Sequence, residues 1–215
     1  MSKNYPRNMI GYGSKDLKIS WPNNAKLALQ IVLNYEEGAE NNILHGDKSS
    51  ETFLSEIIGA KAIKGRHINM ESIYEYGSKR GFWRLNNLFQ EKKIPVTIFG
   101  VAMALERNPE VCEAIKKGDY EIACHGLRWI DYQNIKKSVE KKHMKQAIRI
   151  MKKIFGERPM GWYTGRCSPN TRDLVFDDGG FLYDSDSYSD DLPYWEHRGK
   201  KKQLIIPYTL DNNDM

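Results

Sequence analysis

The sequence has 215 residues, which is enough for one domain with a sizeable core and too few for two. Hydrophobic residues make up 40% of it and aromatic residues 11%, so the composition excludes a wholly disordered chain. The net charge of +5 comes from lysines spread along the chain and not from one dense block. This pattern favours a solvated surface over a face that binds nucleic acid.

The three cysteines, Cys112, Cys124 and Cys167, show no CxxC spacing, so the sequence predicts neither a disulfide framework nor a zinc-thiolate site. Residues 1–18 are polar and contain no apolar stretch of secretory length. No apolar run of membrane-spanning length, about 18 residues, occurs anywhere in the sequence. We therefore expect a cytoplasmic protein that does not partner a membrane.

The first 24 residues contain several prolines and glycines, a composition typical of an irregular arm. A single domain is expected to follow over residues 25–215. Residues 25–33 are mostly apolar and of strand length, which predicts a buried strand. Residues 39–69 are rich in polar side chains and predict a long loop with at most one short helix, around residues 51–58. Loops of that length inside a compact domain usually serve a function.

Downstream, segments with helical spacing of apolar residues alternate with short apolar runs. Helices are expected at residues 70–90, in two pieces, and at 108–117, 138–155 and 171–177. Strands are expected at residues 94–101, 120–124, 161–164, 181–184 and 203–208, the last preceded by a basic turn at 198–202. This alternation indicates an α/β fold, either an open parallel sheet or a barrel.

Polar residues fall just after the C-terminal ends of several expected strands: Glu36 and Glu37, His125, Arg166, and an acidic and aromatic loop at 184–191. In a (β/α) barrel this rim is where active sites are built. Adjacent residues of an extended segment point in opposite directions, so one of the two glutamates can face a pocket while the other serves a different partner. Taken singly, each feature also fits an ordinary structural role: an exposed acid pair, a structural histidine, a buried ion pair or a solvated turn.

A metal site is not indicated by the residues around His125, and no cofactor is expected. No second imidazole lies at short ligand spacing, and the position one helical turn further on is Trp129, which cannot bind a metal. Cys167 has no histidine beside it in sequence to activate the thiol, so a nucleophilic role is not favoured.

Three segments, in chain order, resemble motifs of the polysaccharide deacetylase (NodB-like) superfamily: Asn34-Tyr-Glu-Glu-Gly38, His125-Gly-Leu-Arg-Trp129 and Gly165-Arg-Cys-Ser-Pro169. In that superfamily a strand ends in paired acids, a later strand ends in a histidine followed four residues on by a second, and an arginine motif comes afterwards. Here both acids are glutamates where the deacetylases carry aspartates. Trp129 stands where they carry the second metal-binding histidine.

The same departures resemble the metal-independent allantoinases of that superfamily. The resemblance extends over nearly the whole chain, through Tyr5-Pro-Arg, Met9-Ile-Gly-Tyr-Gly13, Leu44-His-Gly-Asp47, Asn69-Met-Glu-Ser-Ile-Tyr-Glu-Tyr-Gly77, Gly81-Phe-Trp-Arg84, Gly161-Trp-Tyr-Thr-Gly-Arg166, Asp190-Asp-Leu-Pro-Tyr-Trp195 and Pro207-Tyr-Thr-Leu-Asp211. It implies a distorted (β/α) barrel, incomplete because the C-terminal third of such enzymes is missing. It also implies purine catabolism in the cytoplasm, hydrolysis of allantoin or a related ureido ring, and either a homo-oligomer or a complementing C-terminal fragment.

The resemblance places Glu36 at the position of the family's catalytic base, where it would activate water for attack on the ring carbonyl. Such a base supplies about 10²- to 10⁴-fold of rate. His125 would donate to the developing oxyanion or to the leaving nitrogen, and Arg166 would keep Glu36 ionised and oriented. No metal is required. The residues expected to bind the substrate ring are Glu37, Trp129, Tyr163, Asp190 and Asp191.

Two alternatives stay open at this point. A metal-dependent deacetylase of an N-acetylated glycan, acting in carbohydrate metabolism, is disfavoured by the missing second histidine and by the absence of an export signal. A non-catalytic remnant that survives as a binding or scaffold protein is the other. Stoichiometric zinc in the purified protein would favour the deacetylase.

Overall fold

The computed structural model describes residues 5–213, and the chain divides after Gln30 into a short N-terminal unit and a main unit that begins at Ile31. In the N-terminal unit, residues 5–30 form irregular chain with one 3₁₀ helix, η1 (Pro22–Asn24). The expected buried strand at 25–33 is wrong in its first part. Leu27 and Leu29 are exposed, because residues 25–30 pair with no strand in the described chain, and β1 begins only at Val32.

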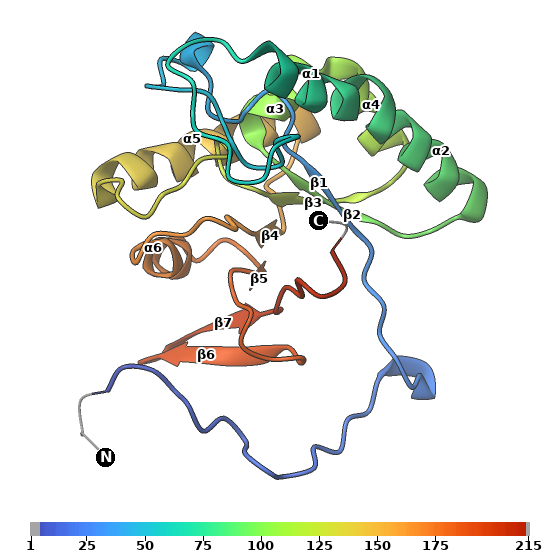
Figure 1. Ribbon diagram of the computed structural model, residues 1–215. Coiled ribbons are helices and arrows are strands. Elements are labelled where there is room, and N and C mark those ends of the chain that lie inside the picture. Colours follow the sequence, from blue (N-terminus) through green and yellow to red (C-terminus); the bar gives the residue numbers. More distant parts are fainter. Residues whose placement is uncertain (1–4, 214–215) are drawn as a thin grey trace. The chain divides into compact units, whose positions relative to one another are not determined.

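The main unit is built on one seven-stranded sheet in the order β1-β2-β3-β4-β5-β7-β6 (Figure 1). The strands are β1 (Val32–Tyr35), β2 (Thr97–Gly100), β3 (Glu121–Cys124), β4 (Gly161–Trp162), β5 (Tyr183–Asp184), β6 (Tyr194–Arg198) and β7 (Lys201–Ile205). Neighbouring strands pair parallel throughout, except that β6 runs antiparallel to β7. The mostly parallel sheet confirms the α/β fold class. β6 was not expected, because its sequence mixes charged and aromatic residues without an apolar run.

The helices of the main unit are α1 (Ile68–Tyr76), the π-helical η3 (Gly77–Gly81), α2 (Phe82–Lys92), α3 (Ala102–Arg107), α4 (Pro109–Lys117), α5 (Lys137–Phe155) and α6 (Thr171–Asp178). The two expected pieces at 70–90 are one continuous helix joined through η3. The helix expected at 51–58 is wrong, since that loop contains only the 3₁₀ turn η2 (Ile43–His45), and α3 was not expected. In the part of the chain that the structure describes, no helix is long and apolar enough to span a bilayer.

Local sequence signals account for where the helices begin and end. The side chain of Asn108 accepts a hydrogen bond from the backbone of Val111, and Pro109 follows it at the first position of α4. The helix α5 is followed by its C-cap residue Gly156, whose positive φ of 84° suits a residue without a Cβ. These signals determine where α4 begins and where α5 ends.

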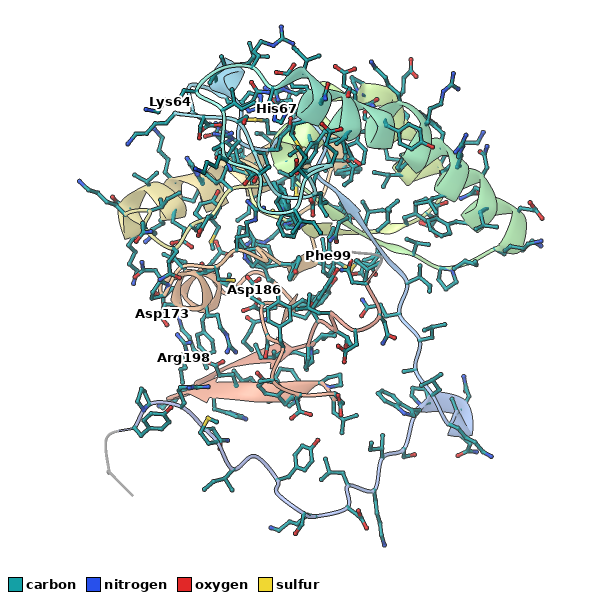
Figure 2. The ribbon with its side chains drawn as sticks, in the orientation of Figure 1. Lys64, His67, Phe99, Asp173, Asp186 and Arg198 are labelled. Atoms are coloured by element: carbon teal, nitrogen blue, oxygen red, sulfur yellow. The ribbon has the colours of Figure 1, made fainter. Side chains whose placement is uncertain are left out.

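The basic run expected to form a turn lies at the hairpin between β6 and β7, where Gly199 and Lys200 make the turn itself. Figure 2 shows Asp173 on α6 and Arg198 on β6 facing each other, and Arg198 donates a hydrogen bond to Asp173. The hairpin is thereby joined to α6 by this charged contact. It is joined to the rest of the sheet by the pairing of β7 with β5.

The two faces of the sheet carry different side chains, because successive residues of a strand point to opposite faces. On the face covered by α1 to α5 (Figure 1), residues such as Tyr35, Ile98 and Cys124 belong to the main core. On the other face, Phe99 (labelled in Figure 2), Ala123, Tyr163 and Tyr183 form a second, smaller cluster. Glu36 comes directly after Tyr35, the last residue of β1. Its side chain is therefore directed away from the helices.

Candidate active site

The strand register brings the candidate residues together at one edge of the sheet. Aligned residues at the carboxyl ends of β1 to β4 are Tyr35, Gly100, Cys124 and Trp162. The residues that follow three of them are Glu36, His125 and Tyr163. Because they follow aligned residues of parallel strands, their side chains emerge on the same face of the sheet.

Glu36 and His125 form a hydrogen-bonded pair, with His125 Nε2 at 3.0 Å from Glu36 Oε1. A carboxylate oxygen only accepts, so the imidazole proton lies on Nε2, and Nδ1 is buried with no partner among the described residues. The His125 side chain is 1% exposed and that of Glu36 is 15% exposed. The ring of Tyr163 packs on the imidazole at 4.8 Å between centroids. The pair therefore combines an enclosed imidazole with a carboxylate that still reaches solvent.

Among the described residues Arg166 makes no hydrogen bond or ion pair with Glu36, so the expected partner is wrong. Among the described residues its ion pair is with Glu51, at 3.1 Å between Nη1 and Oε2. Its guanidinium carbon lies 3.8 Å from the centre of the Trp129 ring, a cation–π contact, and Phe53 packs against it at 5.1 Å. Burial works against ionisation of Glu51, but Arg166 and hydrogen bonds from neighbouring amides keep its pKa below the usual value.

Glu37 points to the opposite, helix-covered face. Its Oε2 accepts the backbone N–H of Glu36 at 2.9 Å, and a Cβ added at Gly77 would lie only 2.1 Å from its Oε1. Burial, together with the nearby charges of Glu36 and Glu40, raises the pKa of Glu37 to about 7. Glu37 lines a cavity of about 380 Å³ on that side, between the first strand and α1. It does not share the space next to His125.

The remaining expected substrate-binding residues lie in two different places. Tyr163 is buried beside His125, and its hydroxyl is 3.0 Å from that of Tyr188. Asp190 accepts a hydrogen bond from the backbone of Leu192 in the turn before β6, and Asp191 is exposed. No hydrogen bond or ion pair between described residues joins either aspartate to Glu36 or His125.

Asp186 was not singled out from the sequence, although it lies in the acidic loop at 184–191 that was. One of its carboxylate oxygens accepts the backbone N–H groups of Thr164 at 2.7 Å and Gly165 at 2.9 Å (Asp186 is labelled in Figure 2). It thereby holds the segment that leads into Arg166. Burial and the charge of Asp186 also raise the pKa of Cys167, which argues against a thiolate nucleophile.

Glu51 was also missed, and the only sequence signal for it was the length of its loop. That loop carries Glu51 back to Arg166, 115 residues away in sequence. Spacing along the chain contains no information about such a contact.

The donor set does not fit the divalent metal that deacetylases of the resembling superfamily bind. Within residues 5–213, no three histidine, cysteine, aspartate or glutamate side chains are grouped so that they could hold an ion. Trp129 offers no ligand atom, Glu37 lies against Gly77, and Nε2 of His125 is engaged by Glu36.

The family model for polysaccharide deacetylases matches residues 69–175 of the chain. A Schizosaccharomyces pombe (strain 972) protein named "Putative polysaccharide deacetylase" is 39% identical over 229 residues, which cover 97% of this chain and 71% of that protein. The chain belongs to the polysaccharide deacetylase family. This membership confirms the resemblance seen in the three motifs.

Solved structures of two other members of the family are similar along almost the whole chain. The crystal structure of PuuE allantoinase is 56% identical with a TM-score of 0.94, and the match covers 98% of this chain and 71% of that one. The structure of a "probable polysaccharide deacetylase" from Pseudomonas aeruginosa PAO1 gives the same values: 56%, 0.94, 98% and 71%. Similar relatives of this family member thus carry two different functional names.

Proposed function

We propose that this member of the polysaccharide deacetylase family hydrolyses the carbon–nitrogen bond of a cyclic amide, opening the ring of allantoin to give allantoate. Two findings support the proposal. The chain is 56% identical to PuuE allantoinase over nearly its entire length. The Glu36–His125 pair provides a base at the end of β1 with an oriented proton donor next to it.

The observation that carries the proposal is the arrangement at Trp129, which stands where the deacetylases place a second histidine. A guanidinium, that of Arg166, lies on the face of its ring. Arginine has five N–H donors, and the hydrogen bond to Glu51 uses one of them. A side-chain cation is therefore available on the Trp129 ring to polarise a carbonyl oxygen and to stabilise the charge that develops on it.

Glu36 removes a proton from water, and the oxygen of that water adds to the amide carbon while the carbonyl electron pair moves onto oxygen. Arg166 stabilises this oxyanion. When the carbonyl reforms, the carbon–nitrogen bond breaks and the Glu36–His125 pair returns the proton to the departing nitrogen. One water is consumed, and the products are a carboxylate and a free ureido nitrogen. Base catalysis of this kind contributes about 10²- to 10⁴-fold.

The test is an assay of the purified chain with allantoin, with and without EDTA, in which allantoate is quantified. We expect allantoate at equal rates in both samples. A parallel assay measures acetate released from an N-acetylated chito-oligosaccharide, and the zinc content of the protein is determined. Chelator-sensitive release of acetate without any allantoate would show a deacetylase instead. An absence of both products would contradict the proposed function and the deacetylase alternative alike.

A further inference from the structure

Tyr74, on α1, is a buried residue whose hydroxyl has no partner. The side chain is 7% exposed, and its oxygen is enclosed with no hydrogen-bond partner among the described residues. Leaving a buried hydroxyl without a partner costs about 1–3 kcal/mol. A folded chain tolerates such a group at a cost, and functional sites are where such costs are commonly found.

The other buried tyrosines of the described chain all have hydroxyl partners. Tyr35 contacts Ser78 and Asn108, Tyr132 contacts His143, Tyr163 contacts Tyr188, and Tyr183 donates to Glu121. Tyr74 is thus the exception within a set of five buried tyrosines. Its unpartnered hydroxyl is not a general property of how this chain buries phenols.

Tyr74 is placed at the candidate active site. Its ring packs against that of Trp129 with 6.0 Å between centroids. The guanidinium of Arg166 makes its cation–π contact with the same Trp129 ring. Burial raises the pKa of Tyr74, the carboxylates of Glu51 and Glu36 raise it further, and Arg166 lowers it. The phenol therefore stays protonated as a hydrogen-bond donor.

We propose that Tyr74 donates a hydrogen bond to the carbonyl oxygen of the substrate amide, next to Arg166, and is a substrate-contacting residue of this site. The inference rests on the function proposed above. Phe53 packs on Trp129 at 5.5 Å and is 43% exposed, and its loop contains no helix around it. The proposal requires that the substrate displace this partly exposed side chain to reach the phenol.

The test is Tyr74→Phe, which removes only the hydroxyl. We expect kcat/KM for ring opening to fall about 10- to 100-fold, the loss of one strong hydrogen bond in the transition state. We expect the free energy of unfolding of the ligand-free variant to be unchanged or higher, because no partner is lost. The matched control is Tyr120→Phe, whose hydroxyl contacts Gln90 and Asn86 away from the site; it should lose stability and keep the wild-type rate.

The two proposals can fail separately. If the wild-type chain opens allantoin and Tyr74→Phe does so at the same kcat/KM, the inference about Tyr74 is overturned while the proposed function stands. If the wild-type chain is inactive, the proposed function fails and the inference about a substrate contact fails with it. If the wild-type chain is active, a Tyr74→Phe variant that is clearly less stable than wild type would mean that the hydroxyl has a partner within the folded chain, which also overturns the inference.

Discussion

Glu36 and Glu37 are neighbours with the same side chain, yet the structure gives them opposite surroundings. Glu36 emerges on the face of the sheet that carries His125 and remains partly exposed. Glu37 emerges on the helix-covered face, where its carboxyl lies against Gly77. Glu36 follows directly after β1 and Glu37 lies in the turn that comes next, so the end of the strand and this turn together produce the division. One residue of offset thus separates a candidate base from a buried structural acid.

The two carboxyl groups also differ in the partners that their surroundings provide. An N–H from His125 is directed at Glu36. Glu37 loses solvent and gains only backbone donors, so its pKa rises to about 7. A carboxyl group that prefers to be neutral is a weak ligand for a cation. Glu37, in these surroundings, is therefore a poor donor for a divalent metal.

The largest effect should come from removing each carboxylate in turn and comparing the rates. We expect Glu36→Gln to lower the rate of allantoate formation by about 10²- to 10⁴-fold, because the amide cannot accept the proton of water. Glu37→Gln should stay within about tenfold of wild type, since its side chain does not face the substrate. Initial rates with both proteins shown to be folded provide the measurement. Equal losses in the two variants would contradict the division of roles.

A second prediction concerns the contact between Glu37 and Gly77. Gly77→Ala should destabilise the protein by about 1–3 kcal/mol, because the new Cβ must displace a buried carboxyl group. In a Glu37→Ala background the same substitution should instead stabilise by about 0.5–1 kcal/mol, since Gly77 has helical φ and ψ and alanine is the better helix former. Chemical denaturation of the four proteins completes the cycle. Identical effects in both backgrounds would show that the contact carries no energy.

The position of Glu36, His125 and Arg166 at the ends of strands could be predicted from the sequence. Each follows an apolar run, and parallel strands present their carboxyl ends at one edge. The ion pair of Arg166 could not be predicted, because its partner Glu51 comes from a loop with no regular structure. Tyr74 was equally hidden, since a tyrosine at helical spacing indicates core packing and gives no sign of whether its hydroxyl is bonded.

The fold shows the same contrast between features that the local sequence determines and features that depend on distant parts of the chain. The buried strands and the long helix α5 were predicted because periodic apolar residues determine them locally. The strand β6 exists only through its pairing with β7, and the exposed apolar residues at 25–30 lack any pairing that would make them a strand. Tertiary partners decide both cases, and a single sequence does not show those partners.

The last prediction concerns a change of stability with pH that belongs to Glu37 alone. Its ordinary pKa is 4.5 and the folded chain raises it to about 7. Between these values the unfolded chain gives up the proton and the folded chain keeps it, so the free energy of unfolding falls as pH rises, and it levels off above the folded pKa. Glu37→Gln should therefore gain on wild type through this window, by roughly 3 kcal/mol above about pH 7, because each unit of pKa corresponds to about 1.4 kcal/mol. Burial raises the pKa of Asp184 to about 7 as well, but Asp184 is present in both proteins and its contribution cancels in the difference. Urea denaturation of the two proteins at a series of pH values measures this difference. A difference that does not change with pH would contradict the prediction. It would mean that Glu37 is ionised in the folded chain and is solvated more fully than its place against Gly77 allows.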